Sequence, residues 1–135
     1  MLTNNTHAAL AGVTRIYPAA AGHGEVHALG PVDLTLARGE FFTVVGPSGC
    51  GKSTLLEVLA GLSPASAGDT SFEGKPVEGR VPEGVGVVFQ EDASFPWLTV
   101  WDNVAFGLRR AGVDPAEVER RVRDAIAFMG LKDFA

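Results

Sequence analysis

Nine consecutive residues combine the types and the spacing that hold phosphate groups, and they fit the pattern G-x-x-x-x-G-K-[ST]. They are Gly46, Pro47, Ser48, Gly49, Cys50, Gly51, Lys52, Ser53 and Thr54. Because glycine has no β-carbon, the backbone at Gly46, Gly49 and Gly51 can adopt positive φ angles and approach phosphate oxygens closely. We therefore expect the successive N–H groups to form an anion-binding nest at the start of a helix.

The side chains at the end of this loop complete a site for a nucleoside triphosphate. Lys52 adds a positive charge that reaches the β- and γ-phosphates, and the hydroxyl of Ser53 is a ligand for Mg²⁺. Thr54 is expected to contact an oxygen of the α-phosphate. The alternative interpretation is a glycine-rich turn before an ordinary helix, and the segments on either side decide between the two.

Those segments are a strand and a helix in the required order. Residues 40–45 are rich in aromatic and β-branched side chains and predict a short buried strand. Residues 53–62 predict a helix that stops at Gly61. Strand, glycine loop and helix follow one another as in a phosphate-binding loop, so we expect an α/β fold that binds a nucleoside triphosphate.

Further strands are predicted on both sides of this unit. Two strands are expected over residues 8–17 and 26–36, joined by a loop over residues 18–24, because the second segment alternates in part between apolar and polar side chains. Short strands are also expected near residues 69–73 and 85–89, with a segment containing Gly and Pro between them.

The last third of the chain predicts two helices. Thr99 is a suitable N-cap for the first, whose apolar residues recur at i, i+3, i+4 and i+7. These residues are Trp101, Val104, Ala105 and Leu108. The second helix begins after Asp114, carries Pro115 in its first turn and ends at Gly130, beyond which no further element is predicted. Two i,i+4 ion pairs are expected on its surface, Glu117–Arg121 and Glu119–Arg123.

Composition limits the classes of protein to consider. A length of 135 residues favours one domain, and a net charge of −5 argues against a nucleic-acid-binding surface. The single cysteine excludes an internal disulfide and favours a reducing compartment. We expect no signal peptide, because the first residues lack a basic stretch followed by an apolar one. No segment approaches the roughly 18 apolar residues of a membrane-spanning helix, so a membrane role would be peripheral.

Two ungapped blocks resemble a known family. GEFFTVVGPSGCGKSTLLEVLAGL and VGVVFQEDASFPWLTVWDNVAFGL are similar to the ATP-binding subunits of ABC transporters, nearest to importers of the nitrate, sulfonate and taurine type. The resemblance implies the P-loop NTPase core of an ABC ATPase with N-terminal antiparallel strands. It divides residues 1–135 into a β-subdomain with the P-loop core (8–95) and the start of a helical subdomain (96–135).

The resemblance also implies ligands and partners. ATP and Mg²⁺ are the expected ligands. The expected partners are a transmembrane permease subunit, a second ATPase subunit that completes a homodimer, and, indirectly, a solute-binding protein outside the membrane. Nucleic acid is not expected as a partner. The implied location is the cytoplasmic face of the cell membrane.

Four residues outside the loop receive roles from the resemblance. The amide of Gln90 would bind Mg²⁺ and the attacking water, and the ring of Tyr17 would stack on adenine. Packing at the end of a strand is the alternative role for Tyr17. Phe95 and Trp97 correspond to the surface that meets the membrane subunit. Trp101, on the apolar face of the first predicted helix, is expected to belong to the core.

The chain also departs from the family pattern. It contains no Leu-Ser-Gly-Gly signature, no apolar strand ending in Asp-Glu and no switch histidine. Residues 85–92 match the glutamine loop, so Glu91 is not assigned as a catalytic base. We expect a partial ABC ATPase domain with no complete catalytic set, in which Lys52 and Gln90 are supporting residues. Such a chain should bind ATP and barely hydrolyse it.

The sequence leaves three alternative functions. A P-loop GTPase or kinase lacks support, since no Asp-x-x-Gly follows the loop and no Asn-Lys-x-Asp occurs. An ABC ATPase of repair or translation agrees less well with the acidic balance and with the segment of residues 95–100. A non-catalytic ATP-binding module remains an alternative.

Overall fold

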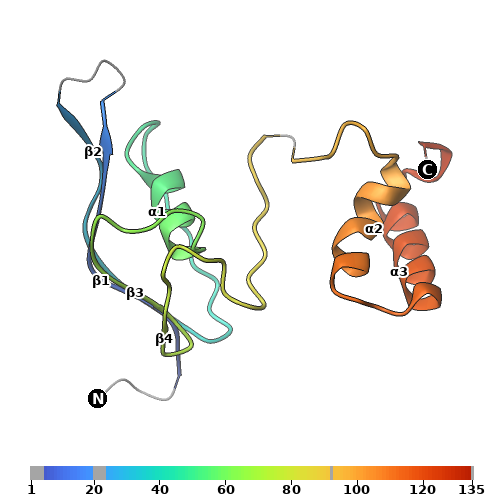
Figure 1. Ribbon diagram of the computed structural model, residues 1–135, viewed down its shortest axis with the longest axis horizontal. Helices are drawn as coiled ribbons and strands as arrows, with labels where there is room; N and C mark the ends of the chain where they lie inside the picture. Colours follow the sequence, from blue (N-terminus) through green and yellow to red (C-terminus); the bar gives the residue numbers. More distant parts are fainter. Residues whose placement is uncertain (1–4, 20–23, 92, 135) are drawn as a thin grey trace. The chain divides into compact units, whose positions relative to one another are not determined.

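The computed structural model describes residues 5–19, 24–91 and 93–134. The chain forms two compact units, Met1–Val87 and Val88–Ala135, and each is described by itself (Figure 1). Residues 20–23 of the predicted loop over 18–24 lie outside the described residues. No helix within the described ranges is both long enough and apolar enough to cross a membrane.

The first unit is built on a four-stranded antiparallel sheet with the order β2-β1-β3-β4. Its strands are β1 (Thr6–Pro18), β2 (Glu25–Ala37), β3 (Ala67–Phe72) and β4 (Lys75–Pro76). Strands β1 and β2 pair along their length, with Leu10 opposite Leu34 and Val13 opposite Val32. The strands predicted over 8–17, 26–36 and 69–73 are therefore confirmed.

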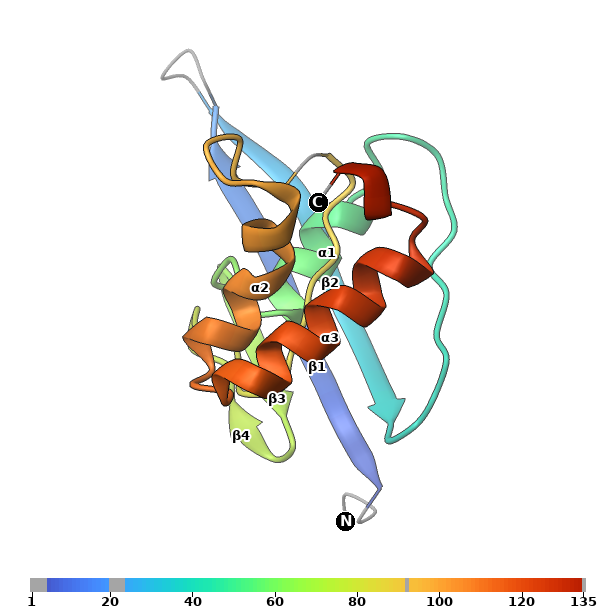
Figure 2. The same ribbon diagram turned by 90° about the vertical axis from the view of Figure 1, so that its right-hand side faces the viewer.

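Helix α1 (Lys52–Leu59) confirms the predicted helix and lies against one face of this sheet (Figures 1 and 2). Its apolar side chains follow helical spacing, so Leu55, Val58 and Leu59 share one face. Val58 is fully buried with Leu10 and Val13 of β1. Helix α1, which follows the phosphate loop directly, is thus fixed to the sheet by apolar burial.

Two predicted strands are absent from the described residues. Neither residues 40–47 nor residues 85–89 have regular secondary structure. Phe41 is 94% exposed and Val88 is 93% exposed, so neither segment is buried as predicted. A strand requires hydrogen bonds to a neighbouring strand, and within the described ranges no segment pairs with either run. The apolar pattern was correctly recognised, but the pairing partner is missing.

The second unit is a pair of helices, α2 (Val100–Arg110) and α3 (Pro115–Phe128), followed by the 3₁₀ turn η1 (Lys132–Phe134). Thr99 and Asp114 cap the two helices as predicted, through Asp102 N–H and through the N–H groups of Ala116 and Glu117. The buried cluster consists of Ala105, Val118, Val122 and Ile126, and Trp101 packs against it as predicted. The prediction that no element follows Gly130 was wrong: a single turn forms, closed by the hydrogen bond from Phe134 N–H to Leu131 O.

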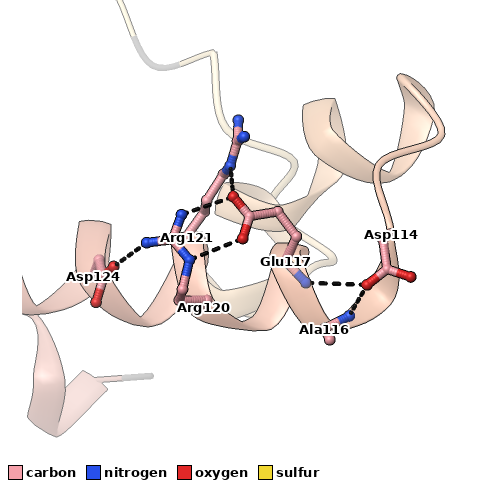
Figure 3. Close-up of polar contacts among 6 residues, drawn as sticks. All are labelled: Asp114, Ala116, Glu117, Arg120, Arg121 and Asp124. Carbon is pink, nitrogen blue, oxygen red and sulfur yellow. Dashed lines mark hydrogen bonds and ion pairs between the residues drawn. The ribbon is translucent and has the colours of Figure 1, made fainter.

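The exposed face of α3 carries both predicted ion pairs, Glu117–Arg121 and Glu119–Arg123. Figure 3 shows the first pair with one more basic partner, Arg120. Glu117 accepts hydrogen bonds from Arg120 at 2.7 Å and 2.8 Å and from Arg121 at 2.6 Å. Arg120 also reaches Asp124 at 3.1 Å. These bonds, from Arg120 first and Arg121 second, lower the pKa of Glu117 to about 2. Because the whole network is exposed, it contributes little to stability.

Candidate nucleotide-binding site

The phosphate loop lies against β2 at Gly51. Gly51 has φ +96° and is the N-cap of α1. A β-carbon added there would lie 2.5 Å from the carbonyl oxygen of Ala28. Both the left-handed backbone and this close approach require glycine. The glycine before the lysine of the sequence pattern is thus explained by the close packing of the loop against β2.

The start of α1 keeps its backbone donors free of any side-chain cap. Its first helical hydrogen bond runs from Leu55 N–H to Gly51 O at 2.8 Å, and Gly51 makes no side-chain cap. The preceding N–H groups, of Lys52, Ser53 and Thr54, therefore have no acceptor within the helix. In α2 the side chain of Thr99 accepts from one such group, Asp102 N–H, and in α3 the side chain of Asp114 accepts from two, those of Ala116 and Glu117. This donor set fits an anion such as a phosphate.

Lys52 folds back over its own loop. Its Nζ donates to the carbonyl oxygens of Gly46 at 2.9 Å and Pro47 at 2.7 Å, and lies 3.7 Å from the Sγ of Cys50. Gly46, Pro47 and Cys50 are exposed, so the ammonium group can exchange carbonyl oxygens for phosphate oxygens without leaving the loop. The hydroxyl-bearing residue Ser53 is also exposed, in agreement with a metal ligand that faces solvent.

Tyr17 lies in the same unit, near the end of β1. Its backbone pairs with Val26, two residues before Ala28, and its hydroxyl lies 3.5 Å from the Oε2 of Glu57 on α1. Arg15 places its guanidinium carbon 4.3 Å from the centre of the Tyr17 ring. The structure therefore brings Tyr17 to the helix that carries the phosphate loop, and Arg15 covers one face of its ring. The sequence alone assigned no role to Arg15, although its i,i+2 spacing places it on the same face of the strand as Tyr17.

Gln90 belongs to the second unit and is exposed in an irregular segment. Since each unit is described by itself, no geometry relates Gln90 to Ser53, and the role of Gln90 stays a prediction.

The cavity beside the loop does not itself suit a triphosphate. It measures about 350 Å³, and Lys52 and Ser53 lie at its border. Its other lining residues are apolar: Leu34, Leu36, Phe42, Val44, Leu55, Leu56 and Leu59. A larger cavity of about 480 Å³ lies in the second unit, beside Trp101 and Arg109, and no loop residue lines it. Donors suited to phosphate are thus offered by the loop backbone and Lys52 rather than by the apolar lining of the cavity beside them.

Phe95 and Trp97 form a small aromatic cluster in the second unit. The ring of Phe95 lies 4.5 Å from that of Phe106 and 5.6 Å from that of Trp97, measured between centroids. Trp97 is 75% exposed, and Phe106 is 46% exposed.

The profile of the family described as ABC transporter matches residues 29–135, which include the phosphate loop, Gln90 and the aromatic cluster. The chain belongs to the ABC transporter family.

Relatives in this family share much of the sequence and fold. The taurine import ATP-binding protein TauB of Pseudomonas aeruginosa is 48% identical over 104 residues, which are 77% of this chain and 39% of that protein. The spermidine/putrescine import ATP-binding protein PotA of Bacteroides fragilis is 42% identical over 113 residues, which are 82% of this chain and 24% of that protein. The chain thus spans about two-fifths or less of the length of these two relatives.

A solved structure of an ABC cassette confirms the predicted fold class. It is a dimeric ATP-binding cassette in a post-hydrolysis state, bound to ADP and phosphate. It matches with a TM-score of 0.80 and 28% identity, over 95% of this chain and 60% of the cassette. The N-terminal antiparallel sheet and α1 of this chain are thus part of an ABC ATPase fold.

Proposed function

We propose that this chain is the part of an ABC importer's ATP-binding subunit that holds Mg-ATP, through residues 46–54. One observation carries the proposal: the N–H groups of Lys52, Ser53 and Thr54 lie uncapped at the start of α1, under an ammonium group that is bonded only to its own exposed loop. Membership of the ABC transporter family supports ATP as the ligand.

Each residue has a distinct role in this proposal. The loop amides and Lys52 bind the phosphates, and Ser53 and Gln90 hold Mg²⁺, with Gln90 also orienting a water molecule. When bound, Mg²⁺ would neutralise part of the negative charge of the phosphate groups. Tyr17 stacks on adenine, on the ring face that Arg15 leaves free.

Hydrolysis requires more than these residues. The sequence offers no assigned general base, a group worth roughly 10²- to 10⁴-fold in rate. We propose that ATP hydrolysis is an activity of the whole subunit, whereas this chain alone binds ATP and barely turns it over. Turnover of the chain by itself at the rate of a complete ABC ATPase would contradict this proposal.

The proposed partners follow from the family and the aromatic cluster. Residues 8–95 would form the β-subdomain and P-loop core, and residues 96–135 the start of a helical subdomain. Phe95 and Trp97, on either side of this boundary, would face the permease. A second ATPase subunit would complete a homodimer, in line with the dimeric cassette. The complex would act at the cytoplasmic face of the cell membrane on a solute delivered by a binding protein. A small sulfonate or oxyanion is the proposed solute class, because a taurine import protein is among the relatives.

Nucleotide titration of two variants tests the ATP site. Lys52→Ala removes a charge-assisted hydrogen bond to phosphate, worth about 1.5–3 kcal/mol, and should weaken Mg-ATP binding about 10- to 150-fold. Tyr17→Ala should weaken it about 5- to 150-fold through lost stacking, whereas Tyr17→Phe should retain it. Lys75→Ala, a change at an exposed lysine of β4, is the matched control. Wild-type chain that binds no Mg-ATP, or that binds it as Lys52→Ala does, would refute the proposal.

A further inference from the structure

A tight turn presents Trp97 to solvent. Residues Phe95, Pro96, Trp97 and Leu98 close it through the hydrogen bond from Leu98 N–H to Phe95 O, at 3.0 Å. Pro96 occupies the second position of the turn, where its fixed φ is favourable. Trp97 occupies the third position with its ring largely exposed.

One side chain of α2, that of Asn103, binds three backbone groups of this turn and one of the residue that follows it. The Oδ1 of Asn103 accepts from Phe95 N–H at 2.7 Å. Its Nδ2 donates to the carbonyl oxygens of Phe95 at 3.1 Å, Leu98 at 3.2 Å and Thr99 at 2.9 Å. Asn103 is half-buried, and it uses both ends of its amide on a single short segment.

We infer that Asn103 is a positioning residue, which holds the 95–98 turn so that Trp97 meets the membrane subunit in a preset orientation. The inference rests on the proposed function, which makes that subunit the partner of Phe95 and Trp97. Tryptophan is among the residues that most often dominate binding at interfaces. An anchor that is already ordered loses less conformational freedom on binding than one on a mobile loop.

The amide chemistry explains why asparagine suits this position. Aspartate could still accept from Phe95 N–H but could not donate to the three carbonyl oxygens. It would also place its negative charge beside those oxygens. Alanine would remove all four bonds. Both changes should release the turn without touching α3 or the phosphate loop, since none of the bonds involves them.

A double-mutant cycle tests the inference in the assembled importer. The ATP-binding subunit that contains this chain is titrated with the membrane subunit of the same importer, purified in detergent. We expect Trp97→Ala to weaken association at least about tenfold, and Asn103→Ala to weaken it about three- to tenfold. Their combination should bind no more weakly than Trp97→Ala alone, because Asn103 acts only by placing Trp97. Arg110→Ala, at an exposed position of the same helix, should bind as wild type.

Two further measurements separate positioning from general stability. Amide hydrogen exchange at Phe95 should become faster in Asn103→Ala and in Asn103→Asp, and Mg-ATP affinity should stay within about twofold of wild type. If the losses of affinity for the membrane subunit in Trp97→Ala and Asn103→Ala add up in the double variant, the inference is overturned. It is also overturned if either single variant associates as wild type does. Both outcomes leave the proposed ATP-binding function standing. If the wild-type subunit binds Mg-ATP but no membrane subunit, the proposed importer function and the inference both fail.

Discussion

Replacing Gly51 by alanine should disrupt the phosphate loop through two separable effects. The first is the cost of the left-handed backbone at φ +96°, about 1–2 kcal/mol for a residue with a β-carbon. The second is the clash of the new methyl group with Ala28 O, at 2.5 Å. The carbonyl belongs to β2, and overpacking against such a fixed group costs about 1–3 kcal/mol. The expected loss in the free energy of unfolding is therefore about 2–5 kcal/mol.

Gly49 is the matched control for this change. It lies two residues away with φ +77°, and an added β-carbon would meet nothing within 4 Å. Gly49→Ala should cost only the backbone contribution, about 1–2 kcal/mol. Both substitutions reduce the freedom of the unfolded chain equally, so that effect cancels in the comparison. Urea unfolding followed by far-ultraviolet circular dichroism measures the difference. If the two variants unfold at the same midpoint with the same slope, the contact between Gly51 and β2 does not constrain the loop.

Two more perturbations address the site and α3. The thiol of Cys50 is exposed and lies 3.7 Å from the ammonium group of Lys52. Alkylation of this thiol should therefore block Mg-ATP binding, and Mg-ATP should slow the alkylation. Equal labelling rates with and without Mg-ATP would contradict this. The pKa of Glu117 falls from 4.5 to about 2 on folding, so its modest contribution to stability is present above pH 4.5 and is lost as the pH falls toward 2. Acid titration by circular dichroism should show this loss in the wild type and in Glu83→Gln but not in Glu117→Gln, and identical acid profiles for all three would refute the assignment.

The sequence predicted best those elements that are specified locally. The caps at Thr99 and Asp114, the helical spacing of α1 and the paired strands β1 and β2 all depend on residues close to one another or on a continuous apolar pattern. Such signals survive in any context, and the structure contains all of them.

The failures concern features that depend on a partner. Residues 40–45 have the composition of a buried strand, yet they remain unpaired, because a strand also needs a neighbour that composition does not specify. The contacts of Arg15 with Tyr17 and of Asn103 with the 95–98 turn were missed for a related reason. A single arginine or asparagine in a sequence carries no signal until the backbone around it is known. The motif indicated that position 51 requires glycine, but the close approach of this residue to the carbonyl oxygen of Ala28 became visible only in the structure.

The distribution of aromatic residues gives each unit its own optical signal. The only tyrosine of the chain, Tyr17, lies in the first unit, whereas both tryptophans, Trp97 and Trp101, lie in the second. Light absorbed selectively by tryptophan therefore reports on the helical pair, and Trp101→Phe would leave the solvent-facing Trp97 as the sole emitter. Binding of a membrane subunit could then be followed by tryptophan fluorescence and binding of a nucleotide by tyrosine fluorescence, in one sample and without any attached dye.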